Sequence, residues 1–209
     1  MDTPISDAPN LDEILKQIQE TTIPATVLPL ISVLAQHSTE GIPALLELLQ
    51  HHHPAIVSAV ATQLEQLAPT SVEPLIAGFH TCTDQLVQAQ IVCILARIAD
   101  PQALDLLVEV VGVEVANHCQ GNVRRVAARG LGPMVNATTV SGLRQRAIER
   151  LTWALLHAED WALRYAAALS LAEIATSEAQ MTLHQALKQE ADPVVKARIQ
   201  AIVQPAEAA

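Results

Sequence analysis

The chain has 209 residues, half of them hydrophobic and few of them aromatic, and it carries a formal net charge of −10. This length suffices for one sizeable core, and the negative charge argues against nucleic acid as a partner. No run of 18 apolar residues occurs, so no membrane span is expected, and Met1–Pro4 lacks the basic and apolar regions that open a secretion signal. The odd number of cysteines, Cys82, Cys93 and Cys119, favours a reducing compartment over a disulfide framework.

Two helices are predicted at the start of the chain. The first covers residues 10–20, where the spacing of leucine and isoleucine residues gives one apolar helical face. The second covers residues 24–36, and Pro29 is expected to kink it. We interpret residues 1–38 as an N-terminal helical cap that faces a partner.

From residue 39 onward the sequence repeats a unit of helix, short turn and second helix. The second helices align on five anchor residues: His53, Asp84, Gln120, Asp160 and Asp192. An apolar residue follows each anchor by three positions and another by eleven, and successive anchors are 31, 36, 40 and 32 residues apart. This pattern resembles HEAT repeats, whose helix pairs bury their apolar faces only by stacking on their neighbours. The predicted fold is an all-α HEAT-repeat α-solenoid of about five helix pairs, formed by residues 39–209 as one continuous domain.

The anchors have a local physical role. An aspartate at this position is expected to cap the second helix, and Arg164 can pair with Asp160 or with the aspartate of the next repeat. The third repeat departs from the pattern, because Gln120 stands at the anchor and Gly121 follows it. Since glycine is unfavourable inside a helix, Gly121 predicts a close approach of the backbone to another group.

The same repeat carries the most chemically reactive stretch, Asn117–Asn122, which reads NHCQGN. His118 can transfer protons near neutral pH, and Cys119 becomes a strong nucleophile as a thiolate. The alignment places both at the end of the turn before the second helix, where the helix dipole and nearby arginines favour the thiolate. The alternative is structural, with Cys119 packing as a small hydrophobe and His118 capping a helix end.

Arginines follow this stretch. Arg125 and Arg129 are spaced i, i+4 and share a helical face, which suits a carboxylate or phosphate ligand. The alternative is a solvated face, with Arg124 serving in a structural Asp–Arg ladder.

No metal site is expected. The run His51–His53 precedes a proline in a turn and is interpreted as a solvated linker. His80 and Cys82 could join the His118–Cys119 pair in a zinc site, but no Cys-x-x-Cys spacing supports it. Cys93 lies in an apolar helical stretch and is expected in the core.

Two segments resemble a known family. The NHCQGN motif resembles that of the F subunits of phycoerythrocyanin alpha-subunit phycocyanobilin lyase–isomerases. Asp160–Ala167, which reads DWALRYAA, resembles a signature of the wider E/F-type phycobilin lyases. These are cyanobacterial HEAT-repeat proteins that work as E–F heterodimers, and the resemblance covers the chain from about residue 39.

The resemblance implies an enzyme that attaches phycocyanobilin to a cysteine of a phycobiliprotein alpha subunit and isomerises it to phycoviolobilin. Its implied partners are an E-type HEAT-repeat subunit, the phycobiliprotein alpha subunit and phycocyanobilin, which is a substrate and not a cofactor. The implied location is the cytoplasm, in association with the phycobilisome. The catalytic residues are expected to be His118 and Cys119. The residues expected to contact the substrate are Asn117, Gln120, Asn122, Arg124, Arg125, Arg129, Trp161 and Arg164.

The residue types suit this chemistry. Moving a double bond beside ring A requires delivery of one proton and removal of another, which His118 could do in turn. Cys119 could add transiently to the ethylidene group, position the bilin or relay a proton, and the sequence leaves these options open. Two other functions are also open: a non-isomerising phycocyanin alpha-subunit lyase, and a non-catalytic HEAT adaptor in phycobilisome degradation.

Overall fold

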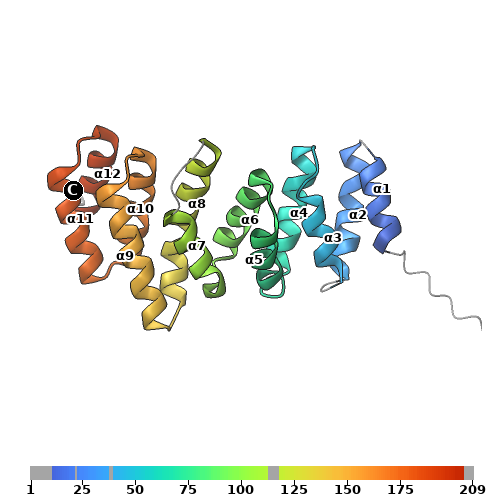
Figure 1. Cartoon of the computed structure of the whole chain (residues 1–209), viewed down its shortest axis with the longest axis horizontal. Helices are drawn as coiled ribbons and strands as arrows, with labels where there is room; N and C mark the ends of the chain where they lie inside the picture. Colours follow the sequence, from blue (N-terminus) through green and yellow to red (C-terminus); the bar gives the residue numbers. More distant parts are fainter. Residues whose placement is uncertain (1–10, 22, 38–39, 113–117, 205–209) are drawn as a thin grey trace, which may run out of the picture. The chain divides into compact units, whose positions relative to one another are not determined.

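The computed structural model describes residues 11–21, 23–37, 40–112 and 118–204. Within these residues every regular element is helical, as predicted (Figure 1). None of the described helices combines the length and apolar character that crossing a bilayer requires. The elements are α1 (Leu11–Glu20), α2 (Pro24–Gln36), α3 (Gly41–Leu48), α4 (Pro54–Gln66), α5 (Val72–Thr81), α6 (Gln85–Ile98), η1 (Pro101–Ala103), α7 (Leu104–Gly112), α8 (His118–Ala137), α9 (Ser141–His157), α10 (Trp161–Ile174), α11 (Ser177–Gln189) and α12 (Pro193–Val203).

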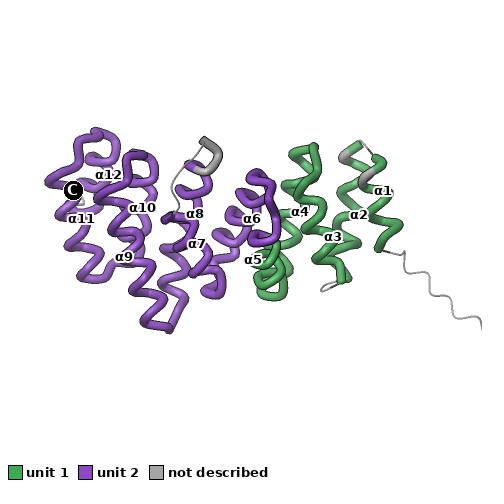
Figure 2. Tube along the Cα trace, in the orientation of Figure 1, with its two compact units in different colours: residues 1–78 green, residues 79–209 purple. Residues whose placement is uncertain are grey.

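In chain order, α3 to α12 form five successive helix pairs behind α1 and α2, which agrees with the predicted HEAT-repeat solenoid. The chain separates into two compact units, Met1–Gly78 and Phe79–Ala209, and the division falls within α5 (Figure 2). This division does not test the predicted boundary after residue 38, which stays a prediction.

The first unit is built around α2, which packs on α1, α3 and α4. Its core is aliphatic because the apolar residues of each helix recur on one face. The fully buried large side chains include Ile18, Ile31, Leu34, Ile42, Leu45, Ile56 and Leu64. The helix α2 continues through Pro29.

In the second unit the helices form two layers. One contains α6, α8, α10 and α12, and the other contains α7, α9 and α11. The centre is α8, which packs on α6, α7 and α10. Gly130 permits this packing, because a Cβ there would lie 2.7 Å from the Ala96 Cβ and 2.8 Å from the Leu107 Cδ2. Gly132 permits close packing of α8 on α10, because a Cβ at this position would lie 3.3 Å from the Cα of Ser170.

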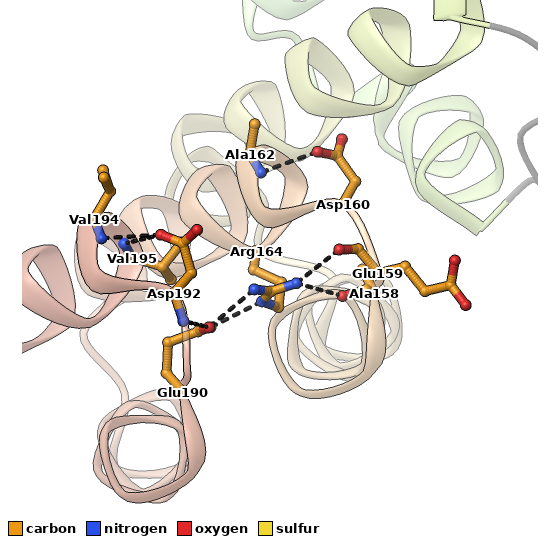
Figure 3. Close-up of polar contacts among 9 residues, drawn as sticks. All are labelled: Ala158, Glu159, Asp160, Ala162, Arg164, Glu190, Asp192, Val194 and Val195. Atoms are coloured by element: carbon orange, nitrogen blue, oxygen red, sulfur yellow. Dashed lines mark hydrogen bonds and ion pairs between the residues drawn. The ribbon is translucent and has the colours of Figure 1, made fainter.

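The predicted anchors cap their helices in four of the five repeats. Asp84, Asp160 and Asp192 each accept backbone N–H bonds at the start of α6, α10 and α12 (the last two are drawn in Figure 3). His53 serves in the same way, because its Nδ1 accepts from the Ala55 N–H at 3.2 Å. These bonds satisfy amide groups that have no partner inside the helix.

The third repeat differs from the prediction. Helix α8 begins at His118, so Gln120 lies inside the first turn and does not cap it. Glutamine is not among the residues that cap helices well, which is consistent with a helix start that lies before the anchor position. Gly121 is also not closely approached by any described residue, because a Cβ there would meet only the Arg125 Nη2, at 3.9 Å.

The apolar positions three and eleven residues after each anchor form the core of the repeats. Most of them are buried: Ile56, Leu64, Val87, Leu95, Leu131, Leu163, Leu171 and Val195. Val123 and Val203 are partly exposed. Val123 lies in the second turn of α8, and Val203 is the last residue of α12.

Candidate functional site

The NHCQGN motif leads into helix α8. Asn117 and the side chains of residues 118–120 lie outside the described structure, so the roles predicted for His118 and Cys119 stay predictions. The backbone shows that residues 118–120 form the first turn of α8 and do not end the preceding turn as expected. Asn122, one turn further, is exposed.

The register of α8 links the motif to the arginines. Positions 118, 122, 125 and 129 are spaced i, i+4, i+7 and i+11, and this spacing keeps them on one stripe of an α-helix. With a rise of about 1.5 Å per residue, the stripe is about 16 Å long. Position 118 of the predicted catalytic pair and the predicted carboxylate-binding arginines therefore belong to one face of one helix, and position 119 lies beside this face.

This face borders an apolar cavity of about 490 Å³, which we call the α6–α8 groove. Such a volume lies within the range of small-molecule sites. The groove is lined by Cys93, Ala96 and Arg97 of α6, by Arg125, Val126, Arg129, Gly130 and Pro133 of α8, and by Ala166 of α10. It therefore joins an apolar lining to three guanidinium groups.

The groove differs in charge from the chain as a whole. The net charge is −10, yet every lysine and arginine except Lys16 lies between residues 97 and 198.

Cys93 lines the groove and is only partly buried, so its predicted place in the core is wrong. Burial raises the pKa of the Cys93 thiol, and the nearby charge of Arg97 offsets this in part. The Cys93 side chain is therefore a neutral thiol at neutral pH.

Arg125 is held by the next repeat. Its Nε and Nη2 donate to the two carboxylate oxygens of Asp160, at 2.7 and 3.1 Å, and Asp160 also caps α10. The expected Asp–Arg ladder therefore exists, but Arg125 and not Arg124 takes part in it. The Arg125 side chain is 42% exposed, so one edge of its guanidinium remains open to the groove.

Arg129 is held less firmly. Its Nη1 donates to the Ser170 Oγ at 3.0 Å and lies 3.5 Å from the Glu173 Oε2, without a hydrogen bond to that carboxylate. Ser170 is fully buried, and its hydroxyl donates to the Ala128 carbonyl at 2.7 Å. Ser170 also lies 3.3 Å from the Arg129 carbonyl, which Pro133 leaves without an i+4 N–H donor. Sequence reasoning missed Ser170, although a lone serine in an apolar helix beside a proline-containing helix was a usable signal.

Arg124 has a structural position. Its side chain is buried, its Nε donates to the Val111 carbonyl at 3.0 Å, and its guanidinium lies 6.0 Å from the Trp153 ring centroid. Arg150 approaches the same ring to 5.8 Å. Burial lowers the pKa of Arg124, Asp160 opposes this, and Arg150 adds to it. The bond joins the C-terminal turn of α7 to α8, which favours a structural role over the predicted contact with substrate.

Arg164 also serves the stacking of repeats (Figure 3). It donates to both carboxylate oxygens of Glu190, at 2.8 and 2.9 Å, and to the carbonyls of Ala158 and Glu159. The pair is nearly buried, with 17% and 4% of the two side chains exposed. The expected pairing of Arg164 with an aspartate is therefore replaced by pairing with Glu190, and these bonds favour a structural role.

The electrostatics of Glu190 follow from these bonds. Burial by itself would raise the pKa of Glu190, but hydrogen bonds from Arg164 and from the Asp192 N–H outweigh it and lower the pKa. The Glu190 hydrogen bond raises the pKa of Arg164 in turn.

Trp161 is 48% exposed and remains available to a ligand.

The histidine and cysteine residues outside α8 do not assemble a metal site in the described part of the chain. The Nδ1 of His51 accepts from the His53 N–H at 3.0 Å, and the His51 and His52 rings stack. Burial and the two neighbouring histidines lower the pKa of His51. The zinc site considered for His80 and Cys82 also requires His118 and Cys119, whose side chains lie outside the described structure.

The comparisons with known proteins now decide the family. A family model of HEAT repeats matches residues 113–203. The bilin biosynthesis protein PecF of Nostoc sp. (strain PCC 7120) is 53% identical over 165 residues, which are 79% of this chain and 95% of that protein. The PecF protein of Mastigocladus laminosus is 47% identical over 195 residues, 91% of this chain and 92% of that one. This chain belongs to the PecF family. One solved structure similar to this PecF-family chain comes from the complex of CpcE and CpcF of phycocyanin lyase from Nostoc, at 28% identity, with a TM-score of 0.68 over 77% of this chain and 96% of that one. The predicted family and fold are confirmed.

Proposed function

We propose that this chain is the F-type subunit of a phycobilin lyase–isomerase that works with an E-type HEAT-repeat subunit. The enzyme attaches phycocyanobilin to a cysteine of a phycobiliprotein alpha subunit and isomerises it to phycoviolobilin in the cytoplasm, beside the phycobilisome. Phycocyanobilin is the substrate, and no resident cofactor is invoked. Membership of the PecF family supports the proposal, as does 28% identity over 204 residues to a protein named phycocyanobilin lyase subunit beta.

The observation that carries the proposal is the single stripe on α8. It aligns positions 118 and 122 of the motif with Arg129, beside an apolar groove whose lining also includes Arg97 and Arg125. A bilin needs these three features together: an apolar surface for its pyrrole rings, cations for its two propionates, and an acid–base group at ring A. An adaptor that only binds protein has no use for a titratable histidine on this stripe.

The division of labour follows from the chemistry of each step. In attachment, the thiol of the acceptor protein adds across the ethylidene double bond of ring A, with sulfur bonding to one carbon and a proton going to the other. The lyase then mainly orients the bilin, which the groove can do. Isomerisation moves the double bond by adding a proton at one carbon and removing one from another, and His118 is assigned both transfers. Cys119 serves as a transient nucleophile or as the proton relay beside it.

The test is co-expression of the full chain with an E-type subunit, the alpha apoprotein and phycocyanobilin, followed by an absorption spectrum of the denatured product. Denaturation removes the influence of the protein on the colour of the chromophore. We expect wild type to yield bound phycoviolobilin. His118→Ala and Cys119→Ser are expected to yield bound but unshifted phycocyanobilin.

The matched controls are His184→Ala and Cys82→Ser, which remove the same side-chain types outside α8. Both should retain the isomerised product. Bound phycocyanobilin from the wild type would identify a non-isomerising lyase, and the absence of any attached chromophore would favour the adaptor function.

A further inference from the structure

The three arginines of the α6–α8 groove are not equally able to bind a ligand. Arg125 is engaged through two hydrogen bonds to Asp160, and that carboxylate in turn caps α10. Moving Arg125 to a ligand would therefore break a bidentate pair and leave a capping carboxylate without its cation. Arg125 acts mainly in the stacking of repeats.

Arg129 can be redirected at little cost. Its contact with Glu173 is 3.5 Å long, and the two side chains are 44% and 38% exposed. Ion pairs with this exposure contribute little to stability, because solvent screens the two charges. The hydrogen bond to Ser170 uses only Nη1, and guanidinium has five N–H donors. Arg129 can therefore donate to an incoming carboxylate while it keeps its contact with α10.

The opposite wall supplies a second cation. Arg97 is exposed on α6, one helical turn after Cys93, and both residues line the groove. Sequence reasoning gave Arg97 no role, because it lies in the preceding repeat. The rest of the lining includes the apolar side chains of Ala96, Val126 and Pro133.

We propose that the α6–α8 groove binds an elongated apolar dicarboxylate, with Arg97 of α6 and Arg129 of α8 holding the two carboxylates. This site rests on the proposed function, in which the ligand is a linear tetrapyrrole whose two propionates sit on its middle rings. Arg97 is then a substrate-binding residue, and Arg125 is a structural one.

The arrangement sets the direction of the bilin. Position 118 lies eleven residues before Arg129 on the same stripe, about 16 Å along the helix axis. An arginine side chain, a propionate arm and one pyrrole ring together span this distance. Ring A therefore points toward the first turn of α8, and the ring at the other end points toward Pro133.

The experiment compares two ligands on the full-length chain: phycocyanobilin and its dimethyl ester, which keeps the rings but has no carboxylate charge. Binding is followed by absorbance titration of wild type and of Arg97→Gln, Arg129→Gln and Arg144→Gln, the last removing an exposed arginine that does not line the groove. We expect the wild type to prefer the diacid by tenfold or more, and each groove variant to lose about tenfold for the diacid and little for the ester. Arg144→Gln should match wild type.

A second measurement does not depend on the variants. Bound phycocyanobilin should slow alkylation of Cys93, which lines the groove, more than alkylation of Cys82, with each site quantified by peptide mass spectrometry. Equal affinity of wild type for diacid and ester, or equal protection of both thiols, would overturn the site.

Failure of the site and failure of the proposed function give different results. If the diacid preference depends on Arg97 and Arg129 but no acceptor becomes chromophorylated, the site stands and the function fails. If phycoviolobilin forms without any diacid preference, the function stands and this site is wrong.

Discussion

Replacing Gly130 by alanine should destabilise the second unit, because α8 passes close to two neighbouring helices at this point. The new Cβ would lie 2.7 Å from the Ala96 Cβ, 2.8 Å from the Leu107 Cδ2 and 3.0 Å from the Ala96 Cα. Carbon atoms prefer separations of about 3.5–4.0 Å, so α6 or α8 must move by roughly the difference. The Ala96 Cβ is attached directly to the backbone and cannot rotate away.

The size of the effect can be worked out with a matched control in the same chain. Gly142 lies in the first turn of α9, and a Cβ there would meet nothing within 4 Å. Both substitutions gain helix propensity, worth up to about 1 kcal/mol, but only Gly130→Ala adds overpacking of about 1–3 kcal/mol. The difference between the two variants should therefore be about 1–3 kcal/mol, with Gly142→Ala the more stable.

The assay is urea denaturation of both variants and wild type, followed by circular dichroism at 222 nm. The double variant Gly130→Ala/Ala96→Gly, which removes the nearest contact, should recover part of the loss. If Gly130→Ala were as stable as Gly142→Ala, the close approach of α6 and α8 would not limit the size of residue 130. The explanation of the glycine would then be refuted.

Two further predictions concern the contacts between repeats. Glu190→Gln should cost about 3 kcal/mol at neutral pH, because it breaks a nearly buried bidentate pair with Arg164. The lowered pKa of Glu190 means that this stabilisation is complete above the unfolded-state pKa of about 4.5 and disappears as pH falls through the folded-state value. Urea denaturation across an acid pH series should therefore show wild type converging on the variant, and a constant gap down to the lowest pH would contradict the pairing. Asp160→Asn should retain the helix cap and lose only the half-exposed pair with Arg125, which should cost about 0–1 kcal/mol of unfolding free energy. Asp160→Ala should lose about 1 kcal/mol more, because alanine cannot cap the helix. Equal stability of the two variants would show that Asp160 does not cap α10.

The structure changes the interpretation of the arginines more than that of the helices. Arg124 and Arg125 are adjacent in sequence, and both could fit an Asp–Arg ladder by spacing alone. In the structure Arg125 reaches Asp160, while Arg124 is buried against Val111 and Trp153. The rotation of α8 about its axis decides which arginine faces the next repeat, and packing against α6, α7 and α10 sets that rotation.

The prediction from the motif was correct for the family and wrong for the place of the motif in the helices. NHCQGN and the DWALRYAA segment were sufficient to indicate the family, since both are continuous in sequence. The alignment misplaced the start of α8, because it treated Gln120 as a capping residue like the aspartates of other repeats. The groove beside α8 was not predicted, because its lining comes from three helices of three repeats.

The sequence by itself determined the features that depend on neighbours a few residues apart. These are the helical periodicity, the aspartate caps of α6, α10 and α12, the repeat length and the signature motifs. Only the tertiary structure decided which side chains from different repeats meet: Arg125 with Asp160, 35 residues away, and Arg129 with Ser170, 41 residues away. The physical reason is that local propensity acts within a helical turn, whereas a groove and its charges depend on how closely separate helices pack and how each is rotated. At Gly130 the helices can pack this closely because residue 130 has no side-chain methyl group.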